Sequence, residues 1–310
     1  MAPRTLEYNA TLEAKVDMSD VLAVFKVVPD TPIPEGRWFI PGQYLTLGLN
    51  NEAKPELGSV RRAMSIASAP QQRRTIDFYV RYVSTPESDN PLTHLLWNMK
   101  PGDRMSMTTR AIGKFNIDDT IGLEDKRLKI LVAAGTGLAP FTSMVESDIE
   151  VDPKADLSSY VLLHGASYPN EIGYKERLEQ LARDNGLHYL PTISRPKEAP
   201  EWKGDTGRVE DFFKPDRITA LEQAIGLKPG ELTPERAVIY ICGLTGTIAM
   251  TIERLLGRGF VPFHRRIRRE LGFDDAVEST IYYEQYDNEP VLKVKDPVEL
   301  ARLKALLPAS

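Results

Sequence analysis

Cysteine is almost absent from this sequence, since Cys242 is the only one among 310 residues. These residues therefore cannot form an internal disulfide, and they cannot supply the four thiolates that an iron–sulfur cluster normally needs. The four histidines lie far apart along the chain and show none of the spacings typical of a metal site. We expect neither a metal ion nor a cluster bound by these residues.

Long hydrophobic runs are also missing. No apolar segment approaches the roughly 20 residues needed to span a bilayer, and residues 1–17 resemble neither a signal peptide nor an arginine-rich transit peptide. Basic residues are not in excess, because 39 Lys and Arg stand against 44 Asp and Glu, for a formal net charge of −5. This balance argues against general attraction to nucleic acid or to an anionic membrane. The sequence predicts a soluble cytoplasmic protein. Any anionic partner is expected to bind through a local basic patch.

The chain is long enough for two domains. Its first part has the short apolar segments that are typical of a β-sheet protein. Up to about residue 122, short β-type segments at 21–28, 43–49, 63–68 and 75–83 are separated by turn clusters such as "IPEG" and "KPGD". In "TIDFYVRYV", Ile76, Phe78 and Val80 alternate with Asp77 and Tyr79, which is the period of a half-buried strand. Residues 1–122 therefore predict an antiparallel sheet or barrel.

From residue 123 the apolar segments lengthen and alternate with helical patterns, which indicates a parallel sheet covered on both faces. The predicted strands are 128–135, 159–167, 188–194, 237–243 and 279–286. Two predicted helices, 174–186 and 246–259, end at glycines. Residues 123–287 therefore predict an α/β domain, and residues 288–310 follow it as an extension.

The first parallel strand runs into a glycine turn, "GTGLAP", at residues 135–140. A tight turn between a parallel strand and a helix presents main-chain N–H groups and the positive end of the helix dipole to an anion. The turn matches neither the dinucleotide fingerprint GxGxxG nor the phosphate loop GxxxxGK[ST]. Taken alone, it is equally well explained as a plain connection with Pro140 opening the helix.

The glycine turn is one of six short motifs that can be interpreted together. In order they are "RAMSIAS" at 62–68, "GTGLAP" at 135–140, "ISRP" at 193–196, "TGR" at 206–208, "YICG" at 240–243 and "YEQY" at 283–286. Together they resemble the bacterial type of the ferredoxin–NADP reductase family across about residues 10 to 287. The resemblance implies an N-terminal antiparallel β-barrel that carries FAD and a C-terminal α/β domain with a five-stranded parallel sheet that binds NADP(H).

The resemblance also implies the residues on the flavin side. Arg62 would bind the FAD pyrophosphate, for which a planar guanidinium is well suited, and Ser65 would lie near the reactive flavin N5. At the position between them the family usually has tyrosine, and this chain has Met64, which offers no phenolic hydroxyl. The FAD-binding residues implied are Arg62, Ala63, Met64, Ser65, Tyr79, Val80, Arg81, Leu92, Thr93 and Tyr286.

On the coenzyme side, the resemblance places Arg195 and Arg208 around the 2′-phosphate of NADP(H), with Lys197 as a possible helper. A third position that is usually arginine is Ser167 here, so the preference over NAD(H) need not be absolute. The NADP-binding residues implied are Gly135, Thr136, Gly137, Ser167, Arg195, Arg208, Cys242 and Gly243. The residues implied at the reacting centre are Ser65, Cys242, Glu284 and Tyr286, with Cys242 used for packing because no base is placed beside it.

Tyr286 would cover the flavin face on which hydride arrives, and it must give way because transfer needs the reacting atoms about 3 to 3.5 Å apart. In close relatives of this type the chain ends at or just after this aromatic residue, whereas this one continues to Ser310. Asp296, Pro297 and Glu299 predict a short helix there. Because Leu300, Leu303 and Leu307 form one apolar stripe, we hypothesise that the helix folds over the flavin domain or exchanges with a second subunit.

The resemblance implies a flavoenzyme that passes electrons between NADP(H) and ferredoxin or flavodoxin, both usually acidic proteins. The basic cluster Arg265, Arg266, Arg268 and Arg269 is the predicted docking patch, unless it forms ion pairs with the acidic segment 274–278. Two other functions remain open. One is the reductase of an oxygenase system, and the other is a flavin or nucleotide sensor without catalysis. The oligomeric state is not predicted.

Overall fold

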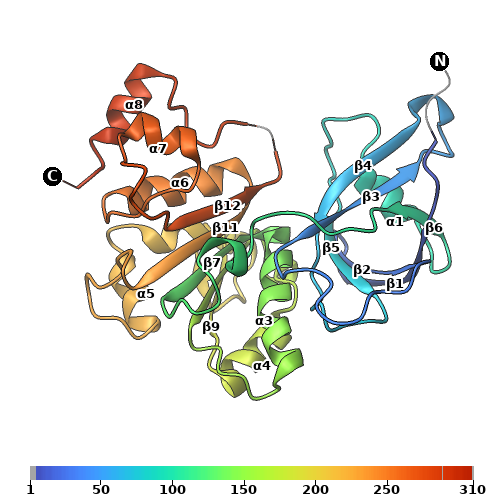
Figure 1. Cartoon of the computed structure of the whole chain (residues 1–310), viewed down its shortest axis with the longest axis horizontal. Helices are drawn as coiled ribbons and strands as arrows, with labels where there is room; N and C mark the ends of the chain where they lie inside the picture. The colour runs from blue at the N-terminus through green and yellow to red at the C-terminus, as the bar shows by residue number, and fades with distance from the viewer. Residues whose placement is uncertain (1–4, 288, 309–310) are drawn as a thin grey trace. The chain divides into compact units, whose positions relative to one another are not determined.

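The protein is described from a computed structural model, which covers residues 5–287 and 289–308. The chain divides into two compact units (Figure 1). The barrel unit comprises the residues up to Leu123 together with Leu138–Ala155, and the parallel-sheet unit comprises Glu124–Gly137 and the residues from Asp156 onward. Within the described residues, no helix is long and apolar enough to cross a membrane.

The barrel unit is built on six antiparallel strands. They are β1 (Ala10–Ser19), β2 (Leu22–Pro29), β3 (Tyr44–Asn50), β4 (Ser59–Ser65), β5 (Ile76–Arg81) and β6 (Arg104–Met107), in the order β4-β3-β6-β1-β2-β5. An isolated bridge between Ile66 and Phe78 joins the two ends of this order, so that the sheet nearly closes on itself. Its helices are α1 (Leu92–Asn98), α2 (Ile117–Thr120) and α3 (Ala139–Val151). The predicted antiparallel barrel is confirmed.

Strand β5 differs from the prediction in its burial. Asp77 and Tyr79 were expected on a solvated face, but they are 8% and 4% exposed. The segment after β4 covers this face, because Ser68 Oγ accepts a hydrogen bond from the Asp77 N–H at 3.1 Å. Ser143 of α3 in turn donates to the Ser68 carbonyl at 2.7 Å. The half-buried prediction was therefore wrong, because a neighbouring segment and not the strand's own pattern decides the burial of the outer face.

The parallel-sheet unit has six strands in the order β10-β9-β8-β7-β11-β12. They are β7 (Leu128–Ala134), β8 (Tyr160–Ala166), β9 (His188–Ile193), β10 (Asp205–Thr206), β11 (Ala237–Gly243) and β12 (Ile281–Gln285). The five predicted strands are all present, and the sixth is the two-residue edge strand β10, which pairs with Thr192 and Ile193. So short a strand has no hydrophobic period, which is why the expected number of five was one too low.

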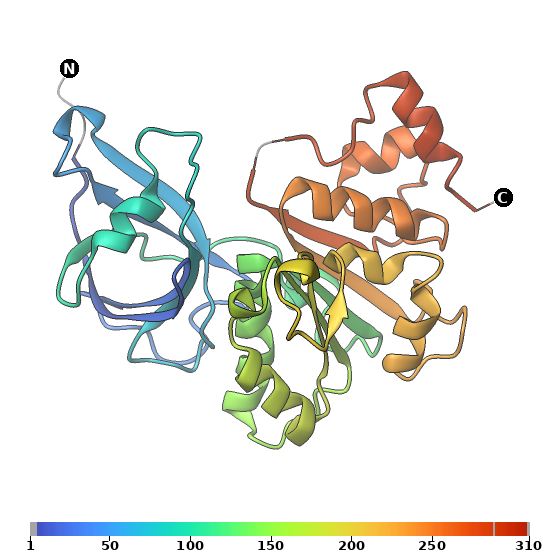
Figure 2. The same ribbon diagram turned by 180° about the vertical axis from the view of Figure 1, so that it is seen from behind.

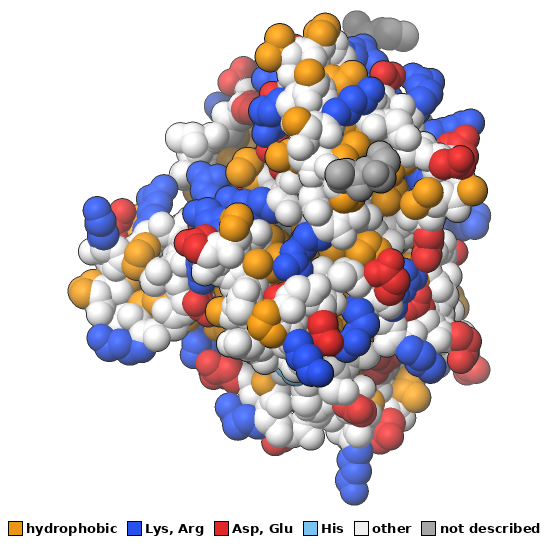
Figure 3. All heavy atoms as spheres, turned by 90° about the vertical axis from the view of Figure 1, so that its left-hand side faces the viewer, with side chains coloured by type: hydrophobic (Ala, Val, Ile, Leu, Met, Phe, Trp, Pro, Cys, Tyr) orange, Lys and Arg blue, Asp and Glu red, His pale blue; other side chains and the backbone are white. Residues whose placement is uncertain are grey.

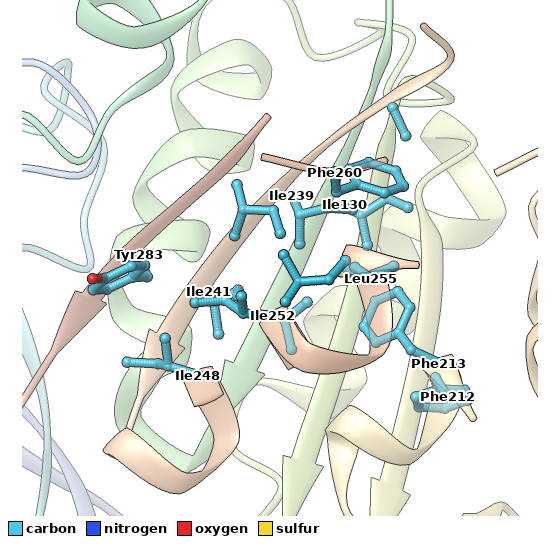
Figure 4. Close-up of a cluster of buried hydrophobic side chains, with 14 of the residues drawn as sticks. Ile130, Phe212, Phe213, Ile239, Ile241, Ile248, Ile252, Leu255, Phe260 and Tyr283 are labelled. Atoms are coloured by element: carbon cyan, nitrogen blue, oxygen red, sulfur yellow. The ribbon is translucent and has the colours of Figure 1, made fainter. Parts of the chain in front are cut away.

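Helices cover both faces of this sheet. They are α4 (Lys175–Asn185), α5 (Ile218–Ala224), α6 (Thr245–Leu256), α7 (Arg265–Leu271) and α8 (Pro297–Lys304). Figure 4 shows α6 laid against the sheet, with Ile248, Ile252 and Leu255 packed towards Ile239 and Ile241. Leu178 and Leu181 of α4 and Ile248 and Ile252 of α6 are buried. Tyr174, the first residue of the helix predicted over 174–186, lies before α4 as its N-cap, in a left-handed conformation with φ of 58°.

The C-terminal helix belongs to the parallel-sheet unit. Leu303 is fully buried in the core of that unit, and Leu300 and Leu307 pack against the same core. Figure 2 shows α8 beside α7, which it contacts. The predicted N-cap is confirmed, since Asp296 accepts from the Val298 N–H at 2.9 Å. The hypothesis that this stripe covers the flavin domain or a second subunit is corrected, because the apolar surface it needs is supplied by its own unit.

Candidate functional site

The predicted coenzyme residues lie at the carboxyl ends of adjacent parallel strands. Following the strand order, these are Arg208 after β10, Arg195 after β9, Ser167 after β8, the turn Gly135–Gly137 after β7, Cys242 and Gly243 at the end of β11, and Glu284 and Tyr286 at the end of β12. Open α/β sheets bind ligands at this edge, where the strands end and the loops begin. The fold therefore brings residues spread over 152 positions of the chain, from 135 to 286, onto one edge.

The glycine turn is set by close packing of two strand ends. A Cβ atom on Gly137 would lie 2.0 Å from the carbonyl oxygen of Cys242, and one on Gly243 would lie 2.8 Å from the Cβ of Ala134. No larger residue fits at either position without a shift of main chain. The turn itself is one 3-10 turn, Gly135–Leu138, that leads directly into α3. The glycines therefore hold the ends of β7 and β11 together, whatever else they bind.

Four of the predicted residues form one hydrogen-bonded group at this edge. The Tyr286 hydroxyl donates to the Thr136 carbonyl oxygen at 2.9 Å and accepts from the Cys242 thiol, with Sγ 3.4 Å away. The Tyr286 N–H also donates to the Gly243 carbonyl at 3.3 Å. The residue as a whole is 46% exposed. The hydroxyl of Tyr286 is thus held by the main chain of the glycine turn, while the residue stays partly exposed.

Cys242 is fully buried. Burial raises the pKa of its thiol well above the ordinary value, the Glu284 carboxylate raises it further, and the hydrogen bond to Tyr286 opposes both. A thiol held protonated in this way is a poor nucleophile. Its position supports packing beside Tyr286 and gives no support to covalent catalysis.

The next contact, between Asp287 and Thr245, was not predictable from the motifs. Asp287, directly after Tyr286, accepts hydrogen bonds from the Thr245 N–H at 3.1 Å and from the Thr245 hydroxyl. Partial burial works to raise the pKa of Asp287, but the hydrogen bonds from Thr245 and from the Glu289 N–H hold it below the ordinary value. A carboxylate at the N-terminus of α6 is favourable. The chain directly after Tyr286 is thereby tied to the first residue of α6.

Arg195 and Ser167 are neighbours, because the Arg195 N–H donates to the Ser167 carbonyl at 3.1 Å. The Arg195 guanidinium donates to the Tyr168 hydroxyl at 2.6 Å and lies over that ring, 5.2 Å from its centre. The Tyr168 hydroxyl donates to Glu198 at 2.8 Å. Arg195 is exposed and held in one orientation by an aromatic residue that the motifs did not reveal.

Arg208 stands at the start of the 3-10 helix Val209–Phe213, and its side chain is 71% exposed. Asp211 accepts from the Arg208 N–H at 3.1 Å, and the same carboxylate takes hydrogen bonds or ion pairs from Arg254 at 2.9 Å and Lys214 at 3.0 Å. The main chain of Arg208 is therefore fixed, while its side chain is largely exposed.

The predicted flavin residues of the barrel unit come from three neighbouring elements. Arg62, Ala63, Met64 and Ser65 lie on β4, Tyr79, Val80 and Arg81 on β5, and Leu92 and Thr93 on α1. Both β5 and α1 contact β4. Arg61, Arg62 and Ala63 are exposed in succession, although a strand with one packed face should bury every second residue. This open stretch fits a strand that a ligand covers.

The hydroxyl groups of Ser65 and Thr93, on β4 and α1, fit a phosphate-bearing ligand. Ser65 is buried at the end of β4, and the Thr93 hydroxyl is buried without a hydrogen-bond partner among the described residues. An unsatisfied buried hydroxyl is costly, and a ligand oxygen would relieve it once the side chain turned towards it. Met64 packs partly against the barrel core. His94, the neighbour of Thr93, stacks on Tyr82 with ring centres 4.5 Å apart.

The predicted basic cluster on α7 is not exposed at all four of its arginines. Arg268 is buried, and its guanidinium donates to the Ser279 hydroxyl at 2.5 Å and to the main-chain oxygens of Val277 and Asp274. It holds the 274–279 loop and is not part of an exposed patch, which corrects the prediction at that residue. Arg269 pairs with Glu270 at 3.0 Å, and Arg265 and Arg266 are exposed.

Comparison with known proteins tests the family that the six motifs resemble. A model of the oxidoreductase NAD-binding domain matches residues 131–253. The ferredoxin–NADP reductase of Azotobacter vinelandii is 32% identical over 230 residues, which is 71% of this chain and 80% of that protein. The reductase component of phenol 2-monooxygenase from Pseudomonas sp. (strain CF600) is 28% identical over 209 residues, which is 67% of this chain and 53% of that protein.

Among solved structures, a ferredoxin NADP+ reductase from Neisseria gonorrhoeae with bound FAD and NADP is similar, with a TM-score of 0.68 and 25% identity. The match covers 90% of this chain and 98% of that one. The two-domain fold and the family predicted from the six motifs are both confirmed. The chain belongs to the ferredoxin–NADP reductase family, whose members are oxidoreductases that use FAD and NADP(H).

Proposed function

We propose that this protein is an FAD-dependent reductase that moves electrons between NADP(H) and a one-electron carrier protein, ferredoxin or flavodoxin. The observation that carries the proposal is the convergence of the predicted coenzyme residues on the carboxyl edge of the parallel sheet. Relatives named ferredoxin–NADP reductase support the same reaction. Flavodoxin is included because another relative, from Shigella flexneri, is named for both carriers.

On the coenzyme side, Arg195 and Arg208 bind the 2′-phosphate, and the turn Gly135–Gly137 accommodates the pyrophosphate. Guanidinium groups form charge-assisted hydrogen bonds to phosphate oxygens, worth about 1.5 to 3 kcal/mol each. If the two contacts add, they favour NADP(H) over NAD(H) by on the order of 10² to 10⁴ in affinity. Ser167 contributes no third charge.

On the flavin side, Arg62 binds the FAD pyrophosphate, Thr93 a phosphate oxygen, and Ser65 lies at the flavin ring. Bound FAD supplies the ability to take up two electrons as hydride and to release them one at a time. Tyr286 would have to move aside for hydride transfer, because such a transfer needs the reacting atoms within about 3.5 Å of each other. Cys242 packs beside Tyr286 and stays protonated.

The carrier is proposed to dock through exposed arginines of α7, namely Arg265, Arg266 and Arg269. Figure 3 shows a face of the molecule on which basic and acidic side chains are interspersed, so attraction to an acidic carrier must come from a local group. Charge reversal of Arg265 and Arg266 together should slow carrier reduction and flatten its dependence on ionic strength. Unchanged rates at low salt would place the docking surface elsewhere.

The first experiment is the visible absorption spectrum of the purified protein, followed by anaerobic addition of NADPH. Flavin absorption that NADPH bleaches establishes the flavin and the hydride step together. Subsequent oxidation by ferredoxin or flavodoxin, added as the pure carrier, identifies the acceptor. A colourless protein that FAD cannot reconstitute would overturn the flavin assignment, and Met64 would be the first residue to replace by tyrosine.

A second candidate is the reductase of an oxygenase system, favoured by the similarity to the phenol 2-monooxygenase reductase component. This chain spans about half the length of that protein. The same spectroscopic experiment separates the candidates, because an oxygenase reductase reduced by NADPH should pass electrons to an oxygenase component and leave ferredoxin and flavodoxin oxidised.

A further inference from the structure

A buried carboxylate stands beside Arg208. The side chain of Glu210 is 2% exposed, and its Oε1 lies 3.8 Å from Nη1 of Arg208. The other carboxylate oxygen, Oε2, is buried and has no hydrogen-bond partner among the residues that the structure describes. A buried charge is costly unless it is paired. Glu210 therefore pairs with the same guanidinium that is proposed to bind the 2′-phosphate of the coenzyme.

Glu210 cannot easily move away from this position. Its neighbour Val209 packs against Gly165 of β8 so closely that a Cβ atom on Gly165 would lie 2.7 Å from the Val209 Cβ. Its other neighbour, Asp211, is held by Arg254 in an ion pair whose two side chains are each 15% exposed. The main chain on both sides of Glu210 is thus packed in place, and the charge of the side chain stays next to Arg208.

The second predicted phosphate ligand is also shared with acidic groups. The hydrogen bond that Arg195 donates to the Tyr168 hydroxyl has the largest effect in raising the pKa of Arg195, and the carboxylates of Glu198 and Glu171 add to it. Each arginine of the proposed 2′-phosphate site therefore has a carboxylate close by. A phosphate entering this site would meet cations whose charge is already partly balanced.

We propose that Glu210 is a specificity-determining residue that lowers the preference for NADP(H), and that NADH is consequently a second electron donor for this protein. The inference rests on the proposed role of Arg208. A phosphate dianion at Arg208 must share the guanidinium with a fixed carboxylate. NAD(H) carries a neutral hydroxyl at the same place and meets no such opposition, and Ser167 adds no cation that would compensate.

The test measures the dissociation constants of NADP+ and NAD+ for the FAD-loaded protein, by difference absorbance at constant ionic strength. Glu210→Gln removes the charge and keeps the shape. We expect NADP+ to bind about tenfold more tightly and NAD+ to change by less than about twofold. Asp216→Asn is the matched control, because Asp216 is exposed and the variant has the same net charge; it should leave both constants unchanged.

A double-variant cycle shows whether the effect passes through Arg208. In an Arg208→Ala background, Glu210→Gln should no longer change NADP+ affinity. If Arg208→Ala weakens NADP+ binding but Glu210→Gln leaves it unchanged, the role of Glu210 is wrong and the proposed coenzyme site stands. If Arg208→Ala has no effect, the coenzyme assignment fails and this inference fails with it. Glu210→Met, of similar length and uncharged, repeats the test if the glutamine variant does not fold.

Discussion

The hydroxyl of Tyr286 is hydrogen-bonded to the main chain of Thr136, with the two oxygens 2.9 Å apart. This contact joins the last residue of the "YEQY" motif to the glycine turn 150 positions earlier in the chain. The aromatic residue that is proposed to cover the flavin is therefore fastened to the turn that is proposed to hold the coenzyme.

If coenzyme and tyrosine compete at the turn, Tyr286→Phe should tighten NADP+ binding. Phenylalanine keeps the ring and loses only the hydrogen bonds of the hydroxyl, each worth about 0.5–1.5 kcal/mol. The expected gain is about two- to tenfold in NADP+ affinity, measured by difference absorbance. Tyr282→Phe, which removes a hydroxyl from the same strand, is the control and should leave the affinity unchanged.

The 2′-phosphate assignment predicts a selective loss. The Arg195→Ala, Arg208→Ala double variant should bind NADP+ on the order of 10² to 10⁴ less tightly, while NAD+ affinity changes little. Isothermal titration of both nucleotides measures this directly. Equal losses for the two nucleotides would mean that the arginines support the site's structure and do not recognise the phosphate.

Cys242 should be unreactive in the folded protein. Because burial and the Glu284 carboxylate raise the pKa of its thiol, the thiolate that attacks alkylating reagents is scarce at pH 8. Iodoacetamide should modify the chain only after unfolding in urea, as followed by intact mass. Rapid alkylation of the native protein at pH 8 would contradict the buried packing role.

Gly137 should not tolerate a side chain. A methyl group there would meet the Cys242 carbonyl oxygen at 2.0 Å, so Gly137→Ala must push apart the ends of β7 and β11. We expect a fall in the thermal unfolding midpoint of several degrees and loss of NADP+ binding. Gly246→Ala on α6 is the matched control, since nothing lies within 4 Å of its added methyl group. It should be neutral or slightly stabilising.

Leu303→Ala tests where the C-terminal helix packs. Leu303 is fully buried in the core of the parallel-sheet unit, so the variant should lose about 2–5 kcal/mol of stability. Val298→Ala on the same helix is the control, because Val298 is 79% exposed and its truncation should cost less than about 0.5 kcal/mol. Both are compared by thermal unfolding. If Leu303→Ala and Val298→Ala unfold at the same midpoint, the packing of Leu303 in the core of the parallel-sheet unit is wrong.

Much of the fold could be predicted because its signals are local. The strand predicted at 237–243 is observed with the same bounds as β11, since a continuous apolar run between polar segments marks a buried parallel strand. The helix predicted over 246–259 corresponds to α6, with Ile248 and Ile252 fully buried as its spacing required. The two-residue strand β10 and the buried outer face of β5 were not predictable in this way, because each depends on a neighbouring segment.

The candidate site also has features that local sequence patterns predict and features that depend on contacts between distant residues. The family and the residue types at the strand ends could be predicted from the chain alone, because six short motifs in a fixed order can be identified without knowing their contacts. The folded structure was needed to show that Gly137 is required by Cys242, that Asp287 ties the chain after Tyr286 to α6, and that Arg268 is buried while Arg265 is exposed. These contacts join positions far apart in the chain, and hydrogen bonding and burial are set by what the folded chain places next to each group.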